Sequence, residues 1–361
     1  GTCAVASAAD CSGTWTMFGV CAPNPCVQPT GSCCAMDGTC TAATQVACTG
    51  IWTIGGACTP NLCVQPTGSC CAFNGTCAVA TQVACTGSWT MGGVCTPNPC
   101  VQPPPGMVLV PAGTFIMGSP TDEPGRSTDE TQHQVTLTHA MFVSKGEVTQ
   151  SEWQALMGWN ESHFSGSILP VETLTWYDAV SYCNLKSTDW GLAAAYTITG
   201  ITYSGNHIIS ATVTWNQAAN GYRLLTEAEW EYACRATSTT AFCNGAITYL
   251  DCAPLDPNLN QVGWYCGNAS NTTHIVAGKT ANAWGLQDMH GNVFEWCWDW
   301  SGTYPAGPLT DPIGPASGSH RVRRGGSWTD YARSCRSTNR GSYYPTSLDD
   351  GIGLRLTRTA P

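Results

Sequence analysis

The stretch Arg324–Arg336 holds the residue types that could do chemistry. It reads Arg-Gly-Gly-Ser-Trp-Thr-Asp-Tyr-Ala-Arg-Ser-Cys-Arg and places a carboxylate, Asp330, five residues before a thiol, Cys335. A thiolate is a soft metal ligand or a nucleophile, whereas a carboxylate is a hard ligand. The seven histidines add no pattern, because none has a second histidine or a carboxylate at metal-binding spacing. Whether this stretch reacts or binds depends on the elements that position it.

The cysteines divide the chain into two parts. Residues 1–100 contain 16 of the 23 cysteines, and the other 261 residues contain 7. Such a density indicates an oxidising compartment, so we expect an extracellular or cell-surface protein held by disulfides. A cytosolic multi-zinc protein would need histidines or Cys-x-x-Cys pairs here, and the first histidine is His133. The chain starts at Gly1 without an apolar leader, which fits a mature product or a fragment with its export signal upstream.

Charge and hydropathy exclude two classes of partner. The net charge is −10 with only 14 basic residues, so the chain would repel a nucleic acid backbone. No run of about 18 apolar residues occurs, so we expect no membrane span.

A 37-residue repeat accounts for the cysteine-rich part. Cys3, Cys40 and Cys77 are 37 residues apart, and Pro-Thr-Gly-Ser-Cys-Cys-Ala occurs at 29–35 and again at 66–72. A unit this short needs cross-links in place of a core, so we predict short strands and turns around three disulfides per unit. We expect a partial repeat at 1–32, repeats at 33–69 and 70–100, and a proline-rich linker at 101–106. These units are interpreted as a stalk, and a tandem of small binding knottins is the alternative. The predicted disulfide cysteines are Cys3, Cys11, Cys21, Cys26, Cys33, Cys34, Cys40, Cys48, Cys58, Cys63, Cys70, Cys71, Cys77, Cys85, Cys95 and Cys100.

Residues 107–361 predict a larger domain with regular secondary structure. Alternating apolar residues predict strands within 107–118, at 134–138 and at 141–148, and a hairpin over 196–215. A threonine followed three residues later by an acid marks three helix starts: Thr149 with Glu152, Thr175 with Asp178, and Thr226 with Glu229. We therefore interpret these acids as helix caps rather than catalysts. The segment after Arg235, up to Gly285, is irregular and predicts stabilisation by disulfides or metal.

Six motifs in this domain occur in a recognisable order. They are Gly-Met-Val-Leu-Val-Pro-Ala-Gly-Thr-Phe-Ile-Met-Gly (106–118), Lys-Gly-Glu-Val-Thr-Gln-Ser-Glu-Trp (145–153), Pro-Val-Glu-Thr-Leu-Thr-Trp-Tyr-Asp-Ala-Val (170–180), Gly-Tyr-Arg-Leu-Leu-Thr-Glu-Ala-Glu-Trp-Glu-Tyr-Ala (221–233), Asn-Ala-Trp-Gly-Leu-Gln-Asp-Met-His-Gly-Asn-Val-Phe-Glu-Trp (282–296) and Arg-Gly-Gly-Ser-Trp (324–328). Over 107–358 the chain resembles the formylglycine-generating enzyme, or sulfatase-modifying factor, superfamily. The resemblance implies an α+β, loop-rich, C-type-lectin-like fold, and it does not cover the repeats.

The resemblance also bears on catalysis. Formylglycine-generating enzymes oxidise a substrate cysteine with O2, and they use two copper-binding cysteines that follow Arg-Gly-Gly-Ser. The matching positions in this chain are Asp330 and Cys335. Because a hard carboxylate replaces a soft thiolate, we expect the copper site to be absent. A three-histidine iron site, which some relatives use for sulfur chemistry, stays open.

A calcium site is implied by the same resemblance. The matching ligands in the Gly-Asn-Val-Phe-Glu-Trp loop are the carboxylates of Asp288 and Glu295 and the backbone carbonyls of Gly291 and Val293. Hard oxygens on a tight loop suit Ca²⁺, and a plain hydrogen-bonded turn is the alternative.

The seven cysteines of the large domain are an odd number, so one is free or pairs outside the domain. We predict structural disulfides that involve Cys183, Cys234, Cys297 and Cys335, without assigning the pairs.

Residues 329–350 lie between two framework segments and are rich in Tyr, Ser, Thr, Asp and Gly. Amphipathic aromatics with adaptable polar neighbours are typical of a binding loop on a rigid frame. The stretch resembles the variable region of lectin-fold proteins that retroelements diversify, and an ordinary surface loop is the alternative. The candidate ligand-binding residues are Thr329, Asp330, Tyr331, Arg333, Asn339, Tyr343 and Tyr344.

These observations favour a non-catalytic extracellular protein whose stalk carries a formylglycine-enzyme-like domain. That domain would serve assembly, as in a filament subunit, or ligand recognition. Its partner would be another copy of itself, or an extracellular protein or glycan. Two alternatives stay open, namely a copper-dependent oxidase that acts on sulfatase cysteines and a lectin-like receptor with a diversified loop.

Overall fold

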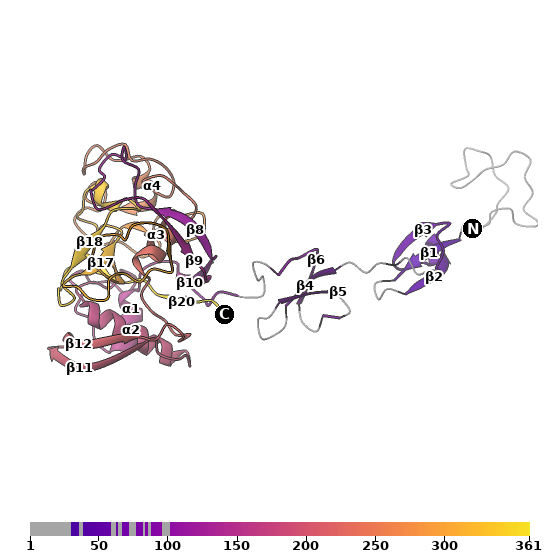
Figure 1. The fold of residues 1–361 in the computed structure, drawn as a ribbon, viewed down its shortest axis with the longest axis horizontal. Helices are drawn as coiled ribbons and strands as arrows, with labels where there is room; N and C mark the ends of the chain where they lie inside the picture. Colours follow the sequence, from indigo (N-terminus) through magenta and orange to yellow (C-terminus); the bar gives the residue numbers. More distant parts are fainter. Residues whose placement is uncertain are drawn as a thin grey trace, which may run out of the picture. The chain divides into compact units, whose positions relative to one another are not determined.

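The computed structural model describes residues 30–35, 39–58, 63, 67–71, 77–81, 84–85, 88–95 and 102–361. The chain divides into two compact units, Gly1–Gln102 and Pro103–Pro361, and the division falls within the predicted linker at 101–106 (Figure 1).

Each described repeat is a small three-stranded antiparallel sheet. In the first, β1 (Thr30–Cys34), β2 (Cys40–Thr44) and β3 (Ile51–Ile54) lie in the order β2-β1-β3, and the 3-10 turn η1 (Gln45–Ala47) follows β2. The second repeats this order with β4 (Thr67–Cys71), β5 (Cys77–Thr81) and β6 (Ser88–Met91). Each sheet therefore begins three residues before the predicted repeat boundary, at 30 instead of 33 and at 67 instead of 70.

Disulfides close these sheets as the repeat pattern predicts. The bridges are Cys33–Cys48, Cys34–Cys63 and Cys40–Cys58 in the first repeat, and Cys70–Cys85 and Cys77–Cys95 in the second. Cys71 is disulfide-bonded as well. The predicted bridges of Cys3, Cys11, Cys21, Cys26 and Cys100 lie outside the described residues.

Steric crowding explains why glycine follows threonine in the repeated Thr-Gly-Ser-Cys-Cys segment. A Cβ atom built on Gly31 would lie 2.1 Å from the carbonyl oxygen of Thr53, and one on Gly68 would lie 2.0 Å from that of Thr90. Only glycine lets the third strand of each sheet approach the first this closely.

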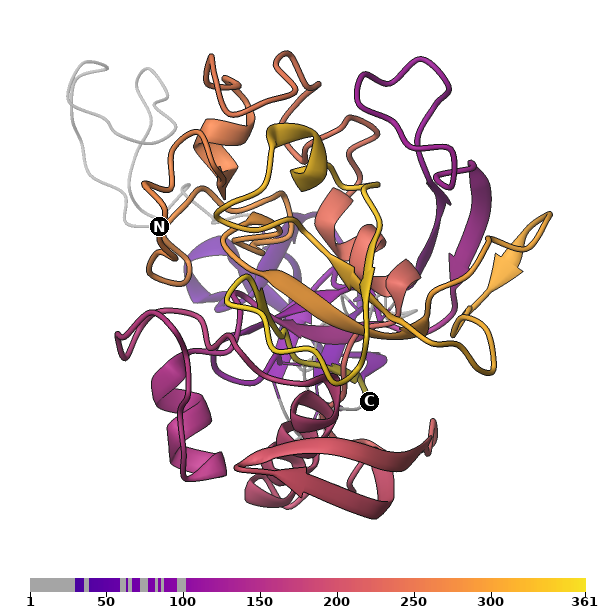
Figure 2. The same ribbon diagram turned by 90° about the vertical axis from the view of Figure 1, so that its left-hand side faces the viewer.

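The large unit is built from small sheets joined by long loops (Figures 1 and 2). One sheet has the order β20-β10-β7 and another the order β16-β9-β8, while β13 pairs with β14. A four-stranded sheet has the order β18-β17-β15-β19, and β11 pairs with β12 as a separate hairpin that packs against α2. The strands are β7 (Met107–Val110), β8 (Gly113–Met117), β9 (His133–Leu137), β10 (Met141–Ser144), β11 (Tyr196–Ser204), β12 (His207–Trp215), β13 (Gly263–Trp264), β14 (His290–Gly291), β15 (Phe294–Trp300), β16 (Leu309–Thr310), β17 (Arg321–Arg324), β18 (Gly341–Tyr343), β19 (Ile352–Gly353) and β20 (Thr357–Thr359).

Three helices begin at the predicted threonines. They are α1 (Gln150–Met157), α2 (Trp176–Asp189) and α3 (Glu227–Arg235), and each has both hydrogen bonds of a capping box. The short helices α4 (Leu259–Val262) and η2 (Ala332–Cys335) lie in loop regions. Few helices, many strands and long loops confirm the predicted loop-rich α+β class. No helix in the described part of the chain is long and apolar enough to cross a membrane.

The prediction of disulfides at four core cysteines is wrong. Cys183, Cys234, Cys297 and Cys335, here called the buried thiols, are free, and so is the half-buried Cys243. The buried thiols belong to four different elements, α2, α3, β15 and η2, and each is packed where its own element meets the core. The bridge of this unit is instead Cys252–Cys266, inside the irregular segment that was expected to need stabilisation.

Candidate binding surface around Arg324–Arg336

The framework of this stretch is the central strand β17. It lies between β15 and β18, so Arg324 is opposite Glu295 and Arg323 is opposite both Trp296 and Gly341. The chain then turns through Gly325 and Gly326, whose φ angles of 105° and 76° favour glycine. A Cβ atom on Gly326 would lie 2.6 Å from the Sγ atom of Cys335. The two glycines therefore allow the returning loop to pack directly on the turn.

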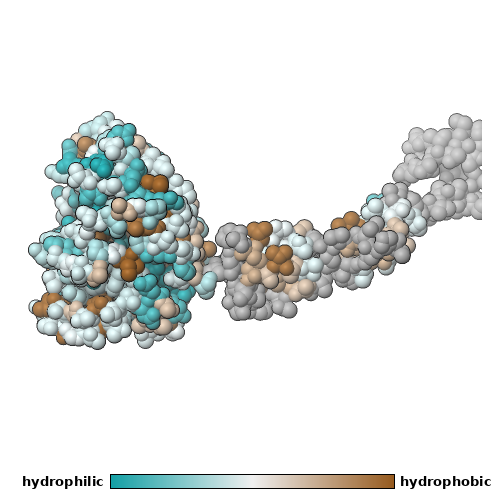
Figure 3. Space-filling model, in the orientation of Figure 1, coloured by the Kyte–Doolittle hydropathy of each residue, from teal (hydrophilic) through white to brown (hydrophobic). Residues whose placement is uncertain are grey.

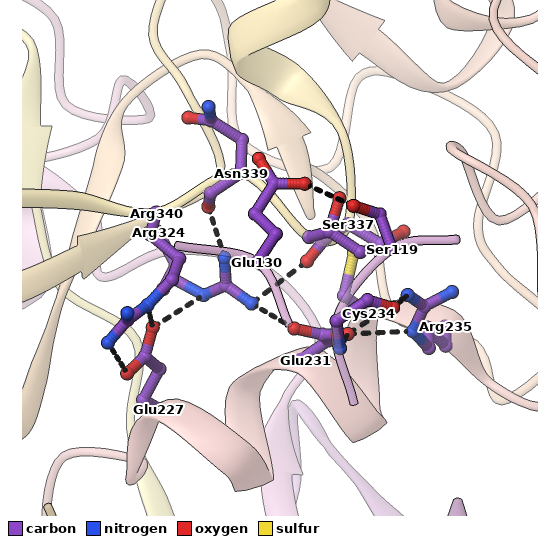
Figure 4. A network of polar contacts seen from close by, with 12 residues as sticks. Ser119, Glu130, Glu227, Glu231, Cys234, Arg235, Arg324, Ser337, Asn339 and Arg340 are labelled. Carbon is purple, nitrogen blue, oxygen red and sulfur yellow. Dashed lines mark hydrogen bonds and ion pairs between the residues drawn. The ribbon is translucent and has the colours of Figure 1, made fainter. Parts of the chain in front are cut away.

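A network of buried ion pairs holds the Arg324–Arg336 stretch in place (Figure 4). Arg324 is fully buried and pairs with Glu231 at 2.5 Å. Glu231 also accepts from Arg235, and Arg340 makes a two-pronged contact with Glu227 at 2.6 and 2.8 Å. These pairs tie the loop to helix α3.

A second anchor lies on the 119–130 loop. Arg336 is fully buried and contacts both oxygens of Glu130, at 2.6 and 2.8 Å. It also pairs with Glu123 at 2.6 Å. Geometry of this kind satisfies the charge of a buried guanidinium.

Asp330 stabilises the turn that follows Gly325 and Gly326. Its Oδ2 atom accepts hydrogen bonds from the backbone N–H and from the hydroxyl of Ser327. Its backbone carbonyl accepts from the N–H of Cys266 at 3.0 Å, which links the turn to the Cys252–Cys266 bridge. Burial raises the pKa of the carboxyl. Asp330 therefore caps a turn and does not act as a soft ligand.

Cys335 is a buried thiol with a pKa held well above the ordinary value by burial and, in addition, by the nearby charge of Asp330. A thiolate is the form that binds copper or attacks a substrate. The environment of Cys335 therefore favours an inert side chain.

Cys234 and His290 form a sulfur–imidazole contact, but it lacks the features of a catalytic pair. The Sγ atom lies 3.7 Å from Nε2 of His290. Nδ1 of His290 donates to the carbonyl of Cys335 at 2.8 Å, and Nε2 accepts from the N–H of Cys243 at 3.1 Å. Both ring nitrogens are thus in use, and burial raises the pKa of the Cys234 thiol to about 12.

The seven predicted ligand-binding residues differ in exposure: three are exposed (Thr329, Tyr331 and Tyr344) and four are half-buried (Asp330, Arg333, Asn339 and Tyr343). Ser337 and Thr338, in the middle of the segment, are fully buried, so the expectation of a surface loop over all of 329–350 is wrong. The reason is the contact of Arg336 with Glu130, which holds the middle of the segment in the core while its two ends are exposed.

The candidates fall into two groups. Near the first end, Tyr331 lies under the guanidinium of Arg333, which pairs with Asp251, and Thr329 is exposed. Near the second end, Tyr344 packs on His320 and Tyr343 belongs to β18. Asp330 is directed to Ser327, and the backbone of Asn339 accepts from Arg324.

Arg323 was missed by the sequence reasoning. Its guanidinium lies 4.1 Å from the ring centre of Phe294 and 5.1 Å from that of Tyr343. Its Nε atom is buried without a partner among the described residues. Burial lowers its pKa, whereas Asp349 and Asp330 act in the opposite direction. The only sequence signal was the doubled arginine before Gly-Gly-Ser.

The predicted calcium ligands fit the ion only in part. Oδ1 of Asp288 is buried and has no hydrogen-bond partner in the described part of the chain, as a cation ligand would be. The carboxylate of Glu295, in contrast, accepts from Arg355 through both oxygens and from the indole of Trp230, so its charge is already neutralised. The prediction that Glu295 is a ligand therefore does not fit this structure.

Glu147 supplies the second unpaired carboxylate at this place. Both of its oxygens are buried, and they lack a hydrogen-bond partner within the residues that the structure describes. Burial raises its pKa well above the ordinary value, and the charge of Asp288 raises it further. The other two predicted ligands, Gly291 at the end of β14 and Val293 just before β15, are both buried. In the described residues the one cluster of three potential metal ligands is Cys34, Cys40 and Cys63, and all three are in disulfides.

One known protein family matches most of the chain. The sulfatase-modifying factor enzyme 1-like domain matches residues 94–360. The chain belongs to this family. The match begins inside the last repeat, before the predicted domain start at 107.

Relatives of this sulfatase-modifying-factor-like chain carry different names. The chaperone protein LppX of Paenibacillus barcinonensis is 34% identical over 275 residues, which cover 70% of this chain and 89% of LppX. The formylglycine-generating enzyme of Streptomyces coelicolor is 28% identical over 292 residues, which cover 71% of this chain and 90% of the enzyme.

Solved structures agree with the sequence relationship. Treponema denticola variable protein 1 aligns with a TM-score of 0.61 at 32% identity and covers 71% of this chain and 95% of its own. PvdO from Pseudomonas aeruginosa aligns with a TM-score of 0.57 at 26% identity and covers 70% of this chain and 94% of its own. These similarities confirm the predicted C-type-lectin-like fold of the sulfatase-modifying-factor-like domain.

Proposed function

We propose that this protein is a non-catalytic extracellular binding protein, in which disulfide-bonded repeats carry a sulfatase-modifying-factor-like domain that recognises a ligand. The observation that carries the proposal is the state of Asp330 and Cys335. The carboxylate caps a turn and the thiol is buried, so the two positions serve structure. Tyr331, which follows Asp330 in sequence, is 47% exposed.

Several observations support an extracellular location. The described repeats depend on disulfides rather than on a large core, and such bridges persist outside the reducing cytosol. A binding role is supported by the relatives, since one is named a variable protein and another a chaperone.

The recognition surface would have two parts. The first contains Tyr331 and Arg333, and the second contains Tyr343 and Tyr344 beside Arg323. Rigid tyrosines provide contact area at low conformational cost. The partly buried Arg323, which has no ion-pair partner in the described part of the chain, provides a charge for a polar ligand group. The ligand would be an extracellular protein or a glycan.

Two measurements test this proposal. The first is titration with Cu(I), together with O2 uptake in the presence of a cysteine-containing sulfatase peptide. We expect neither stoichiometric binding nor turnover, and copper-dependent turnover would establish the oxidase instead.

The second measurement is binding to arrays of glycans and extracellular proteins. The variant Tyr331→Ala/Tyr343→Ala/Tyr344→Ala should lose at least tenfold in affinity for any captured ligand. Tyr203→Ala, which removes a tyrosine that is 60% exposed on the β11–β12 hairpin, should bind like the wild type. Equal binding by the triple variant would refute the assigned surface.

Self-assembly is the second candidate function, and the β11–β12 hairpin favours it. From Tyr196 to Trp215 the chain has no acidic residue, lysine or arginine, although the net charge of the whole chain is −10. Ile201, Tyr203 and Ile209 are 40%, 60% and 39% exposed. Figure 3 shows hydrophobic residues gathered at the end of the large unit where Figure 1 places this hairpin. Uncharged edge strands without blocking lysines can pair with a second copy of the same hairpin.

Sedimentation velocity tests self-assembly. The wild type should show concentration-dependent association that Ile201→Lys/Ile209→Lys abolishes. Ile275→Lys, at an isoleucine that is 50% exposed away from the hairpin, should associate like the wild type. A monomeric wild type at all concentrations would contradict this second candidate.

Calcium stays part of the proposal as a structural ion. Asp288 and Glu147 would hold it through their unpaired carboxylate oxygens, because hard oxygens suit Ca²⁺ and a cation would relieve the repulsion of two buried carboxylates.

A further inference from the structure

A cavity of about 370 Å³ lies between strand β9, the start of helix α3 and the loop that follows β15. Its walls are mostly apolar and include Met117, Ala228, Trp300, Leu309 and Ile313. Small-molecule sites commonly have this size and combine apolar walls with a few polar groups. None of the residues predicted to bind a ligand lines this cavity.

The polar side of the cavity is held rigid by Arg340. Its guanidinium makes a two-pronged contact with Glu227, donates to the carbonyl of Gly302 at 3.0 Å, and lies 3.9 Å from the ring centre of Tyr304. The hydroxyl of Tyr304 also donates to Glu227, at 3.1 Å. Figure 4 shows the Glu227–Arg340 pair beside Arg324. The cations and the Glu227 carboxylate are therefore already paired.

Asp299 is different, because half of its carboxylate has no partner. Its Oδ2 atom accepts from the N–H of Glu227 at 2.8 Å, at the start of α3. Within the described residues, Oδ1 accepts no hydrogen bond and Asp299 forms no ion pair. Asp299 is nevertheless only 4% exposed, and it lines the cavity. Burial raises the pKa of this carboxyl well above the ordinary value, and the charge of Glu227 raises it further. The charge of Arg321 acts in the opposite direction but is outweighed by burial and by Glu227. A buried carboxylate of this kind is costly, and a cationic group placed beside it would reduce that cost.

His133 adds a second acceptor. Its Nδ1 atom contacts the carbonyl of Thr131 at 3.0 Å, so Nδ1 carries the hydrogen and Nε2 of the neutral ring is an acceptor. Nε2 is buried and has no partner among the described residues. The ring packs on Tyr304 at 4.6 Å between centres. Both unpaired polar atoms at this cavity therefore need a donor from elsewhere.

We propose that this cavity is a binding site for a small organic amine, whose ammonium group donates to Oδ1 of Asp299 and whose apolar or aromatic body lies against Trp300 and Ile313. The site is independent of the proposed recognition surface. An ammonium supplies positive charge and a hydrogen-bond donor for Oδ1 of Asp299. A carboxylate ligand would face two acceptors and no free donor.

Isothermal titration calorimetry of the whole chain tests the proposal with three probes of one shape. Tryptamine carries an ammonium group, tryptophol a neutral hydroxyl and indolepropionate a carboxylate. We expect tryptamine to bind at least tenfold more tightly than tryptophol, and indolepropionate not to bind. No binding of tryptamine at millimolar concentration, or equal binding of all three probes, would overturn the assignment.

Substitutions locate the site. Asp299→Asn keeps the shape and the acceptor for Glu227 but removes the charge, so tryptamine should lose its advantage over tryptophol. Asp122→Asn, at an exposed aspartate outside the cavity, should leave the affinity unchanged. If Asp299→Asn does not fold, Ile313→Trp provides the test. Its larger side chain narrows the cavity without changing a buried charge, so tryptamine should bind more weakly. Unchanged tryptamine affinity in the folded Asp299→Asn or Ile313→Trp protein would show that the amine binds elsewhere.

Discussion

Replacing Arg336 by methionine tests how the binding loop is anchored. In the folded protein the Arg336 guanidinium contacts both oxygens of Glu130 at 2.6 and 2.8 Å, one oxygen of Glu123 at 2.6 Å and the carbonyl of Gly125 at 2.7 Å. Arg336 and Glu130 are both fully buried. Arg336→Met would keep a side chain of similar length and leave the Glu130 carboxylate in the core without a counter-charge.

The expected loss is about 3–5 kcal/mol in the free energy of unfolding at neutral pH, which is typical when one partner of a buried pair is removed. The matched control is Arg333→Met. Arg333 lies three residues earlier and pairs with Asp251, but its side chain is 41% exposed and that of Asp251 is 61% exposed. An exposed pair contributes only about 0–1 kcal/mol, so the control should cost little.

The pH dependence gives an independent check. Burial raises the pKa of Glu130, but the hydrogen bond and charge of Arg336 outweigh burial, so the folded pKa is lowered. In the wild type this carboxylate therefore stabilises the fold above its unfolded pKa, and the contribution is lost as pH falls through the folded pKa. In Arg336→Met the lowering by Arg336 is lost, and burial is opposed only by the smaller effect of the hydrogen bonds from Ser119 and Thr338, so the pKa rises. The penalty should then be largest at neutral pH and should shrink as pH falls and Glu130 takes up a proton.

Urea unfolding followed by tryptophan fluorescence measures these differences. The double variant Glu130→Gln/Arg336→Met should recover part of the loss, because the uncompensated charge is gone. A cost of Arg336→Met as small as that of Arg333→Met, or a cost that does not change with pH, would refute the reasoning.

Three further predictions concern other parts of the large unit. Calcium should raise the melting temperature, with about 2.7 kcal/mol of stabilisation at a concentration 100 times its Kd, and Asp288→Asn or Glu147→Gln should abolish the shift; an unchanged melting temperature in the wild type would count against the calcium proposal. Iodoacetamide followed by peptide mass spectrometry should label Cys243 in the folded protein but not the buried thiols, whose pKa values are raised by burial; rapid labelling of any buried thiol would contradict this. Gly326→Ala should destabilise the large unit in thermal unfolding, since the new Cβ would lie 2.6 Å from a sulfur atom at a φ of 76°; a wild-type melting temperature would show that the turn can relax.

The family relationship and the proposed function rest on different kinds of observation. The match over 94–360 shows the family, and similar chains carry names as different as a formylglycine-generating enzyme, a chaperone and a variable protein. Function therefore has to be argued from the residues at the site. In this chain that argument depends on Asp330 and Cys335, because one is engaged in a turn and the other is buried.

The sequence by itself determined the features that depend on short-range patterns. The 37-residue repeat predicted the sheets and bridges of the described repeats, and threonine–acid pairs predicted the starts of α1, α2 and α3. The hairpin over 196–215 was visible as alternating residues around a tight turn. In each case the deciding contacts lie within one repeat, one helical turn or one hairpin, so the pattern of neighbouring residues is enough to specify them.

Only the tertiary structure decided which side chains are buried and which already form ion pairs or hydrogen bonds with other residues of the chain. Arg336 meets Glu130 across 206 residues of sequence, and this contact buries the middle of a segment whose composition suggested a surface loop. Glu295 has the residue type of a calcium ligand, but Arg355, 60 residues away in sequence, neutralises it. The buried thiols are free although cysteines of this number in an oxidising compartment suggested bridges. Burial and pairing of this kind depend on how distant segments pack together, and neither residue type nor local spacing carries that information.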